Sequence, residues 1–167
     1  MKFLIIKIIG GLFITAAGFL IGNTFSKKLS RRRDFLKTFQ VFLSTLSTNL
    51  RYSGADIFSV VKLSAQSANF SEFDLTEYNK PFEDVWHKKV EEIPNCISLN
   101  DSDKELLLEF GSHLGKTDTE GQLRHIELYQ TLFERQLKSA ETEVSDKSRL
   151  YRTIGLFSGI SAALMII

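Results

Sequence analysis

The chain of 167 residues contains little of several residue types that mark particular classes of protein. It has one cysteine, Cys96, which excludes a disulfide framework within the chain and a zinc site built from cysteines. It has only two prolines and ten glycines, whereas 43% of its residues are hydrophobic. This balance excludes a collagen-like or wholly disordered chain, and the length suits about one domain.

The net charge is also small, at +1, because an excess of basic residues in one part of the chain cancels an excess of acidic residues in another. Residues 1–52 hold nine Lys or Arg and one acid, whereas residues 53–167 hold twelve Lys or Arg and nineteen acids. A net charge near zero argues against a strongly basic protein that binds nucleic acid. The division instead indicates a basic N-terminal region joined to an acidic remainder.

The longest uncharged runs lie at the two ends of the chain. Residues 8–25 form a run of eighteen, roughly 27 Å of helix, which is close to the thickness of the hydrocarbon core of a membrane. Residues 153–167 form a run of fifteen, roughly 22 Å of helix, which a thinned bilayer or tight pairing with the first run would accommodate. The alternatives are a cleaved signal peptide at the start and a buried core helix at the end.

Basic residues around these runs predict how the chain crosses the membrane. Five Lys or Arg follow the first run within seven residues, two Lys precede it, and three Lys or Arg lead into the last run. Basic residues favour the cytoplasmic side, so we expect the middle of the chain in the cytoplasm and both termini outside. Attraction to anionic lipid explains the basic run beside a membrane helix more simply than nucleic-acid binding does.

Small residues recur at helical spacing along one face of each terminal run. They are Gly11, Thr15, Gly18 and Gly22 in the first run, and Gly155, Gly159 and Ala163 in the second. Small residues four positions apart let membrane helices approach closely. We therefore predict that the two runs pack against each other through these residues.

The middle of the chain has the periodicity of helices. The pattern predicts a helix over 30–52, a short helix capped by Asp56, a loop over 66–79, and a helix over 81–92 with Pro81 at its first position. Neither alternating apolar runs nor an Asn-Gly turn point to strands. We expect an all-α protein, in which residues 1–26 and 153–167 are transmembrane helices and residues 27–152 form a cytoplasmic helical bundle.

Two helix starts and one turn stand out near residue 115. Ser102 with Glu105, and Thr117 with Glu120, have the spacing of capping boxes. Gly115 lies between them, where a glycine that ends a helix belongs. The pattern predicts two helices joined by a tight turn, the second free of Pro and Gly from residue 122 to residue 154 and able to run on into the last apolar segment.

Residue patterns that carry out catalysis are largely missing. No glycine loop for phosphate and no nucleophile elbow occur in the sequence. His113 and His125 flank the turn with Asp118 between them, but a metal site needs converging ligands, so we expect two ordinary histidines. The paired acids Asp101 and Asp103 are expected at an exposed helix end. We predict no catalytic residue, no metal and no cofactor. The alternative is an enzyme or a metal-dependent regulator that uses His113, Asp118 and His125.

The turn region nevertheless carries a recognisable combination of residues. The first helix ends in EFGSHLGKTD over residues 109–118, Gln122 and residues 125–128 (HIEL) follow, and LYRTIG over residues 150–155 leads into the last apolar run. Together with similar length and an apolar segment at each end, this pattern resembles the stage III sporulation protein AB family. The candidate family-motif or interaction residues are Phe110, Gly111, Leu114, Gly115, Asp118, Gln122, Ile126, Tyr151 and Arg152.

The resemblance implies a membrane protein of endospore-forming bacteria, within the mother-cell complex that builds a channel to the forespore. It also implies a helical domain similar to one domain of the platform proteins of type II secretion and type IV pilus systems. The expected partners are membrane lipid, other sporulation channel proteins and a cytoplasmic secretion-type ATPase, with no nucleic acid and with a homo-oligomer left open. We therefore expect a non-enzymatic platform; a membrane-anchored regulator or adaptor unrelated to secretion is the alternative.

The acidic middle of the chain has two interpretations. Residues 54–120 hold fourteen acids and six Lys or Arg. Such a region can dock on a basic partner by charge complementarity, or it can be an ordinary solvated surface that also stays away from anionic lipid.

Overall fold

The computed structural model describes residues 2–53, 55–73, 75 and 79–166. Within these ranges it describes only the backbone of residues 2–9, 11, 12, 71, 148, 152 and 162–166. Its elements are α1 (Lys2–Ser53), α2 (Ile57–Ser67), the 3₁₀ turn η1 (Ser71–Phe73), α3 (Phe82–Glu91), the 3₁₀ turn η2 (Asn95–Ile97), α4 (Asp101–His113) and α5 (Thr119–Ile166). No strand occurs among the described residues, and the predicted all-α class is confirmed.

The chain divides into two compact units. The helical body, Arg32–Ser139, contains the second half of α1, the first half of α5 and all the shorter helices. The terminal hairpin, Met1–Arg31 with Ala140–Ile167, contains the other halves of α1 and α5. Both α1, of 52 residues, and α5, of 48 residues, are single continuous helices, so neither is interrupted at the boundary between the units.

Helix ends follow the predicted chemistry at slightly different residues. The capping box at α4 uses Asn100 and Asp103, whose side chains each accept a bond from the backbone N–H of the other residue, at 2.7 and 3.1 Å. The predicted box at Ser102 and Glu105 is therefore wrong by two residues. Pro81 lies just before α3, not at its first position. Asp56 caps α2 as expected, accepting from the Ser59 N–H at 3.2 Å.

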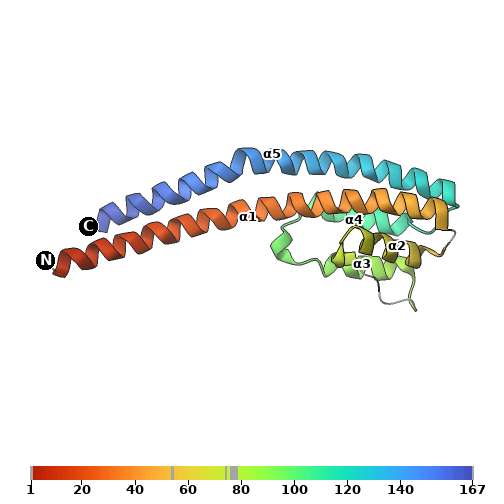
Figure 1. The fold of residues 1–167 in the computed structure, drawn as a ribbon, viewed down its shortest axis with the longest axis horizontal. Helices are drawn as coiled ribbons and strands as arrows, with labels where there is room; N and C mark the ends of the chain where they lie inside the picture. The colour runs from red at the N-terminus through yellow and green to blue at the C-terminus, as the bar shows by residue number, and fades with distance from the viewer. Residues whose placement is uncertain (1, 54, 74, 76–78, 167) are drawn as a thin grey trace. The chain divides into compact units, whose positions relative to one another are not determined.

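The short helices α2, α3 and α4 lie beside the second half of α1 (Figure 1). The core of the helical body is a cluster of buried aromatic rings around this part of α1. The ring of Phe39 lies 4.5 Å from that of Phe133 on α5 and 5.9 Å from that of Phe110 on α4, measured between centroids. Trp86 on α3 is fully buried, and its Nε1 donates to the Leu107 carbonyl at 2.6 Å. These contacts hold α4 and α5 to α1, and α3 to α4.

The body also contains a buried polar cluster that the sequence did not reveal. Arg32 on α1 donates from Nε and Nη2 to the two carboxylate oxygens of Asp103 on α4, at 2.7 and 3.1 Å, and from Nη2 to Gln136 on α5 at 3.3 Å. Both charged side chains are buried. The expectation that Asp103 lies at an exposed helix end, and that Arg32 belongs to a lipid-facing basic run, is corrected by this pairing.

The terminal hairpin brings small residues of α1 and α5 together. A Cβ added at Gly18 would lie 3.1 Å from the Gly159 Cα, and one added at Gly155 would lie 3.1 Å from the Gly22 Cα. A Cβ at Gly159 would in turn lie 2.9 Å from the Thr15 Cα. The helices therefore touch backbone to backbone at the glycines. Contacts at Gly11 lie outside the described residues.

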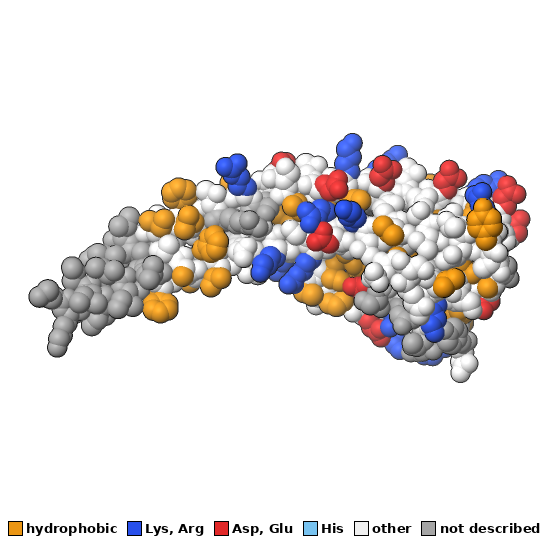
Figure 2. Space-filling view, viewed as in Figure 1, with side chains coloured by type: hydrophobic (Ala, Val, Ile, Leu, Met, Phe, Trp, Pro, Cys, Tyr) orange, Lys and Arg blue, Asp and Glu red, His pale blue; other side chains and the backbone are white. Residues whose placement is uncertain are grey.

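Large apolar side chains cover the described surface of this hairpin (Figure 2). They include Phe13, Leu20, Ile21 and Phe25 on α1, and Leu150, Ile154 and Phe157 on α5, all exposed. Over the described side chains, no helix combines the length and the apolarity that crossing a membrane requires. The predicted segments also include the side chains of residues 8, 9, 11, 12 and 162–167, which lie outside the described ones.

Candidate functional site

The turn between α4 and α5 is closed by one buried glutamine. Gly115 has φ +85°, a left-handed conformation that glycine adopts without strain. Its N–H donates to the Gln122 Oε1 at 3.0 Å, and the Gln122 Nε2 donates to the Thr117 carbonyl at 3.1 Å. Asp118 caps α5 by accepting from the Gly121 N–H at 2.9 Å. The predicted capping box of Thr117 and Glu120 is therefore replaced by a single aspartate cap.

The other family-motif residues around the α4–α5 turn face the core. Phe110, Leu114 and Ile126 are buried apolar side chains. Gly111 lies directly against Trp86, so that a Cβ there would overlap the indole ring. The motif residues on the hairpin therefore stabilise the α4–α5 turn and its packing on α3.

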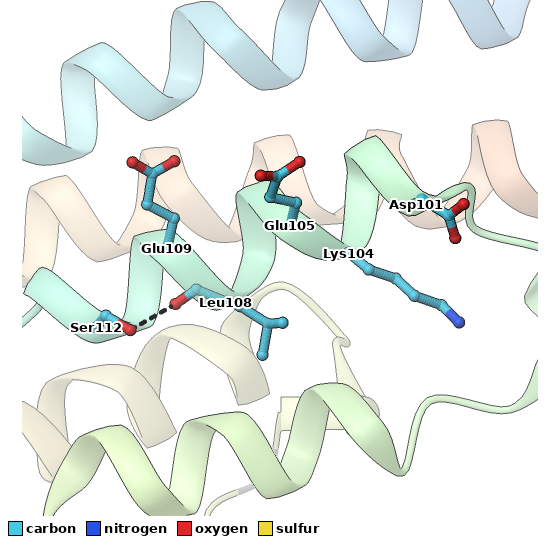
Figure 3. Close-up of a pocket in the computed structure, with 6 residues that line it drawn as sticks. All are labelled: Asp101, Lys104, Glu105, Leu108, Glu109 and Ser112. Atoms are coloured by element: carbon cyan, nitrogen blue, oxygen red, sulfur yellow. Dashed lines mark hydrogen bonds between the residues drawn. The ribbon is translucent and has the colours of Figure 1, made fainter.

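An open hollow of about 550 Å³ lies on the outer face of α4. It is lined by Asp101, Lys104, Glu105, Leu108, Glu109 and Ser112. Figure 3 shows the carboxylates of Glu105 and Glu109 pointing to one side of α4, whereas Leu108 points to the other side. The Ser112 hydroxyl donates to the Leu108 carbonyl at 3.1 Å. Three acids and one Lys make this the acidic face of α4, a surface suited to a cationic partner.

Two histidines and a tyrosine meet beside this face. The ring of His125 stacks on Phe110, at 5.4 Å between centroids, and lies 4.7 Å from the Tyr129 ring. The His125 Nε2 lies 3.0 Å from the Phe110 carbonyl, so it carries the proton and donates. Burial lowers the pKa of His125, because an imidazolium loses its hydration there. Burial, with the neighbouring Glu109 carboxylate, raises the pKa of Tyr129 to about 12.

Metal binding at these histidines has little support in the geometry. The His113 and His125 rings lie 5.8 Å apart, but His113 Nδ1 lies 3.1 Å from the Glu109 carbonyl and Asp118 is engaged as the cap of α5. In the part of the chain that the structure describes, no three His, Cys, Asp or Glu side chains converge on a point where they could hold a metal ion.

The last two candidate motif residues belong to the terminal hairpin. The Tyr151 ring lies 5.7 Å from that of Phe25, so it joins α5 to α1. The side chain of Arg152 lies outside the described ones. Sequence reasoning missed the buried Arg32–Asp103 pair, which positions α4 against α1. Nothing in the local sequence shows that Asp103, and not Asp101, is the buried acid.

Comparison with known proteins identifies relatives over almost the whole chain. The profile of the family described as Stage III sporulation protein AB matches residues 7–167. A relative in Bacillus subtilis (strain 168), named Stage III sporulation protein AB, is 24% identical over 169 residues, covering 96% of this chain and 99% of its own length. No solved structure matches the chain.

Proposed function

The chain belongs to the stage III sporulation protein AB family, and on this basis we propose that it is a membrane-anchored, non-enzymatic platform of the channel between mother cell and forespore. Membership of the family gives the chain a role in sporulation. The match from residue 7 to residue 167 carries the proposal, because it includes both terminal segments and the whole helical body.

The anchor in this proposal is the terminal hairpin. Its support is the pair of uncharged runs, the basic residues that flank them, and the exposed apolar side chains of α1 and α5 (Figure 2). A bilayer would cover those side chains, whereas water would hydrate them at a cost in free energy. The helical body then lies in the cytoplasm on the mother-cell side, and both termini lie outside.

The docking surface in this proposal is the acidic face of α4. A cytoplasmic secretion-type ATPase with a basic surface would approach Asp101, Glu105 and Glu109, whose side chains line one open hollow (Figure 3). Charge complementarity of this kind raises the rate of encounter and fixes orientation. Other channel proteins and further copies of this chain are the remaining partners of the proposal.

The non-enzymatic part of the proposal rests on what surrounds the motif residues. The family is not a known enzyme family, and the hairpin motif residues are engaged in a turn and in core packing. A membrane-anchored regulator or adaptor outside any secretion-like machine is the second candidate. It shares the anchor but predicts no ATPase among the bound proteins.

Affinity purification from sporulating cells after crosslinking separates these two candidates. The wild-type chain should recover a secretion-type ATPase together with channel proteins, and Glu105→Lys should recover at least about tenfold less ATPase. Glu127→Lys is the matched control, because it makes the same charge change at an exposed position of α5 in the helical body. Equal ATPase recovery with both variants contradicts docking at α4, and recovery of no channel protein with the wild type contradicts the platform.

The single cysteine supplies a test of topology. Cys96 is exposed in η2 and is the only cysteine of the chain. In intact protoplasts a membrane-impermeant maleimide should leave Cys96 unlabelled, and it should label Cys96 after lysis. A cysteine appended after residue 167 in a Cys96→Ser background should be labelled in both cases. Mass spectrometry of the mature N-terminus checks the signal-peptide alternative, since an intact residue 1 excludes cleavage.

A further inference from the structure

A groove in the terminal hairpin lies beside the glycine contacts of α1 and α5. It has a volume of about 260 Å³, and its lining includes Gly18, Gly22 and Gly155. These glycines bring the two helices close, as a Cβ at Gly155 would lie 3.1 Å from the Gly22 Cα. Because glycines carry no side chain, they leave a hollow between the larger residues that flank them.

The flanking residues make the groove apolar and aromatic. Ile21 and Phe25 contribute from α1, and Tyr151 and Ile154 contribute from α5. The only other side chain in the lining is Ser158, whose hydroxyl donates to the Gly155 carbonyl at 3.1 Å. With this hydroxyl already bonded, the groove presents hydrocarbon and ring surface to whatever occupies it.

Cations follow the groove in both helices, and we call them its rim. The Lys28 Nζ lies 5.7 Å from the centroid of the Phe25 ring, which itself lines the groove. Lys27 and Arg31 are exposed on the same segment of α1, and Arg149 is exposed on α5 two residues before Tyr151. An apolar groove with cations on the adjoining turns of both helices matches an acyl chain that ends at a negatively charged phosphate.

We propose that this groove binds one anionic phospholipid, with an acyl chain between Ile21 and Ile154 and the headgroup phosphate at Lys28. The proposal rests on the proposed membrane anchoring of the terminal hairpin. Lys28 is three residues beyond Phe25 on α1, so it lies about 4.5 Å further along the helix axis, where a headgroup would follow its chain. Long Lys side chains keep their charge at the membrane surface in this way.

Charge also argues for a lipid over a second copy of the chain. Copies inserted in the same orientation would carry their rims at the same depth, so Lys27 and Lys28 of both copies would repel each other. An added helix would also lack the small-residue contacts that drive close packing, because Gly18 and Gly155 are already engaged with each other. An anionic lipid has neither disadvantage.

Native mass spectrometry of the delipidated full-length protein tests the proposal. We expect one phosphatidylglycerol to bind, with a concentration for half-occupancy at least about tenfold lower than that of phosphatidylcholine with the same acyl chains. Ile21→Trp fills the groove from its wall and should raise the phosphatidylglycerol concentration for half-occupancy at least about tenfold. The matched control is Leu20→Trp, because Leu20 is equally exposed on α1 (62%, against 60% for Ile21) but does not line the groove.

The rim is tested separately from the groove. Lys27→Gln with Lys28→Gln should reduce the preference for phosphatidylglycerol over phosphatidylcholine to about threefold or less, whereas Lys37→Gln should leave it unchanged. Equal binding of the two lipids by the wild type overturns the proposal. So does equal binding by Ile21→Trp and Leu20→Trp, or a dimer mass that Ile21→Trp abolishes, since the groove would then hold a second copy.

Carbonate extraction of cell membranes distinguishes failure of the groove from failure of the anchor. If wild type, Ile21→Trp and Leu20→Trp all resist extraction while only Ile21→Trp loses phosphatidylglycerol, the proposal is supported. If all three resist extraction and bind the lipid alike, the groove is wrong and the anchor stands. If carbonate releases the wild type, the anchor is wrong and the groove proposal falls with it.

Discussion

Arg32 and Asp103, 71 residues apart in the sequence, form a buried bidentate ion pair that joins α1 to α4. The Asp103 carboxylate also accepts from the Asn100 N–H at 3.1 Å, and the backbone N–H of Asp103 donates to the Asn100 side chain at 2.7 Å. One aspartate therefore both begins α4 and positions it against α1. Gln136 extends the cluster to α5 by accepting from Arg32 at 3.3 Å.

Removing one member of this pair should destabilise the body strongly. Asp103→Ala leaves the Arg32 guanidinium buried without its counter-charge and removes half of the capping box, so we expect a loss of about 3–5 kcal/mol of unfolding free energy. Urea unfolding of the full chain in detergent, followed by the fluorescence of Trp86, measures the change, because Trp86 is the only tryptophan and is fully buried. The control is Asp101→Ala, where an exposed acid in the first turn is worth about 1 kcal/mol at most.

Gly111 should tolerate no side chain. A Cβ at this position would overlap the Trp86 ring, so Gly111→Ala forces α3 and α4 apart and should cost about 1–3 kcal/mol despite the better helix propensity of alanine. The Trp86 emission should also shift, since the indole environment changes. Gly10→Ala is the comparison, because a Cβ there meets nothing within 4 Å. A neutral Gly111→Ala would show that the two helices are not packed at this point.

Acid should weaken the body through His125. Its pKa in the folded protein lies below the ordinary value of 6.5 because the ring is partly buried. The unfolded chain therefore takes up more protons as pH falls through 6.5, and the folded state loses stability from there down to the folded-state pKa. Urea midpoints at pH 7.5 and 5.5 should differ less for His125→Gln than for the wild type. A wild-type midpoint that does not change between these pH values would contradict the prediction.

Tyr129 should ionise later than an ordinary tyrosine. Burial and the Glu109 carboxylate raise its pKa to about 12 from the ordinary value of 10.0. The folded state therefore holds its proton more tightly, and this contribution to stability is present below pH 10 and is lost between pH 10 and 12. Phenolate absorbance followed against pH should show a late step, and Tyr129→Phe should remove that step.

Continuity of α5 should matter for sporulation. The helix runs from Thr119 to Ile166 without a break, and Glu141 is an exposed position within it. Glu141→Pro removes a backbone hydrogen bond, clashes with the preceding turn and costs about 3 kcal/mol or more at that position. We expect heat-resistant spores to fall in this variant and to remain normal in Glu141→Ala, which removes the same charge but keeps the helix. Normal sporulation in Glu141→Pro would show that the protein functions without a continuous α5.

Local patterns in the sequence predicted most of the helices, because apolar periodicity and capping residues act within a few positions of each other. The glycine at 115 and the cap at Asp56 lie where local rules placed them. The same rules misplaced the start of α4 by two residues. Both Ser102 and Asn100 are residue types that cap helices. In the structure Asn100 is the cap, and its partner in the capping box is Asp103, the acid that also pairs with Arg32.

The sequence alone predicted the all-α class, showed that neither Pro nor Gly interrupts residues 122–154, and contained no recognisable catalytic pattern. Tertiary structure decided which polar residues are buried. It paired Arg32 with Asp103 and placed the Gln122 amide where it bonds to the backbone of the α4–α5 turn. Asp101 and Glu105 remained on the open face of α4. The physical reason is range. Helix formation depends on neighbours three or four residues away, whereas burial of a charge depends on a partner that only folding brings near.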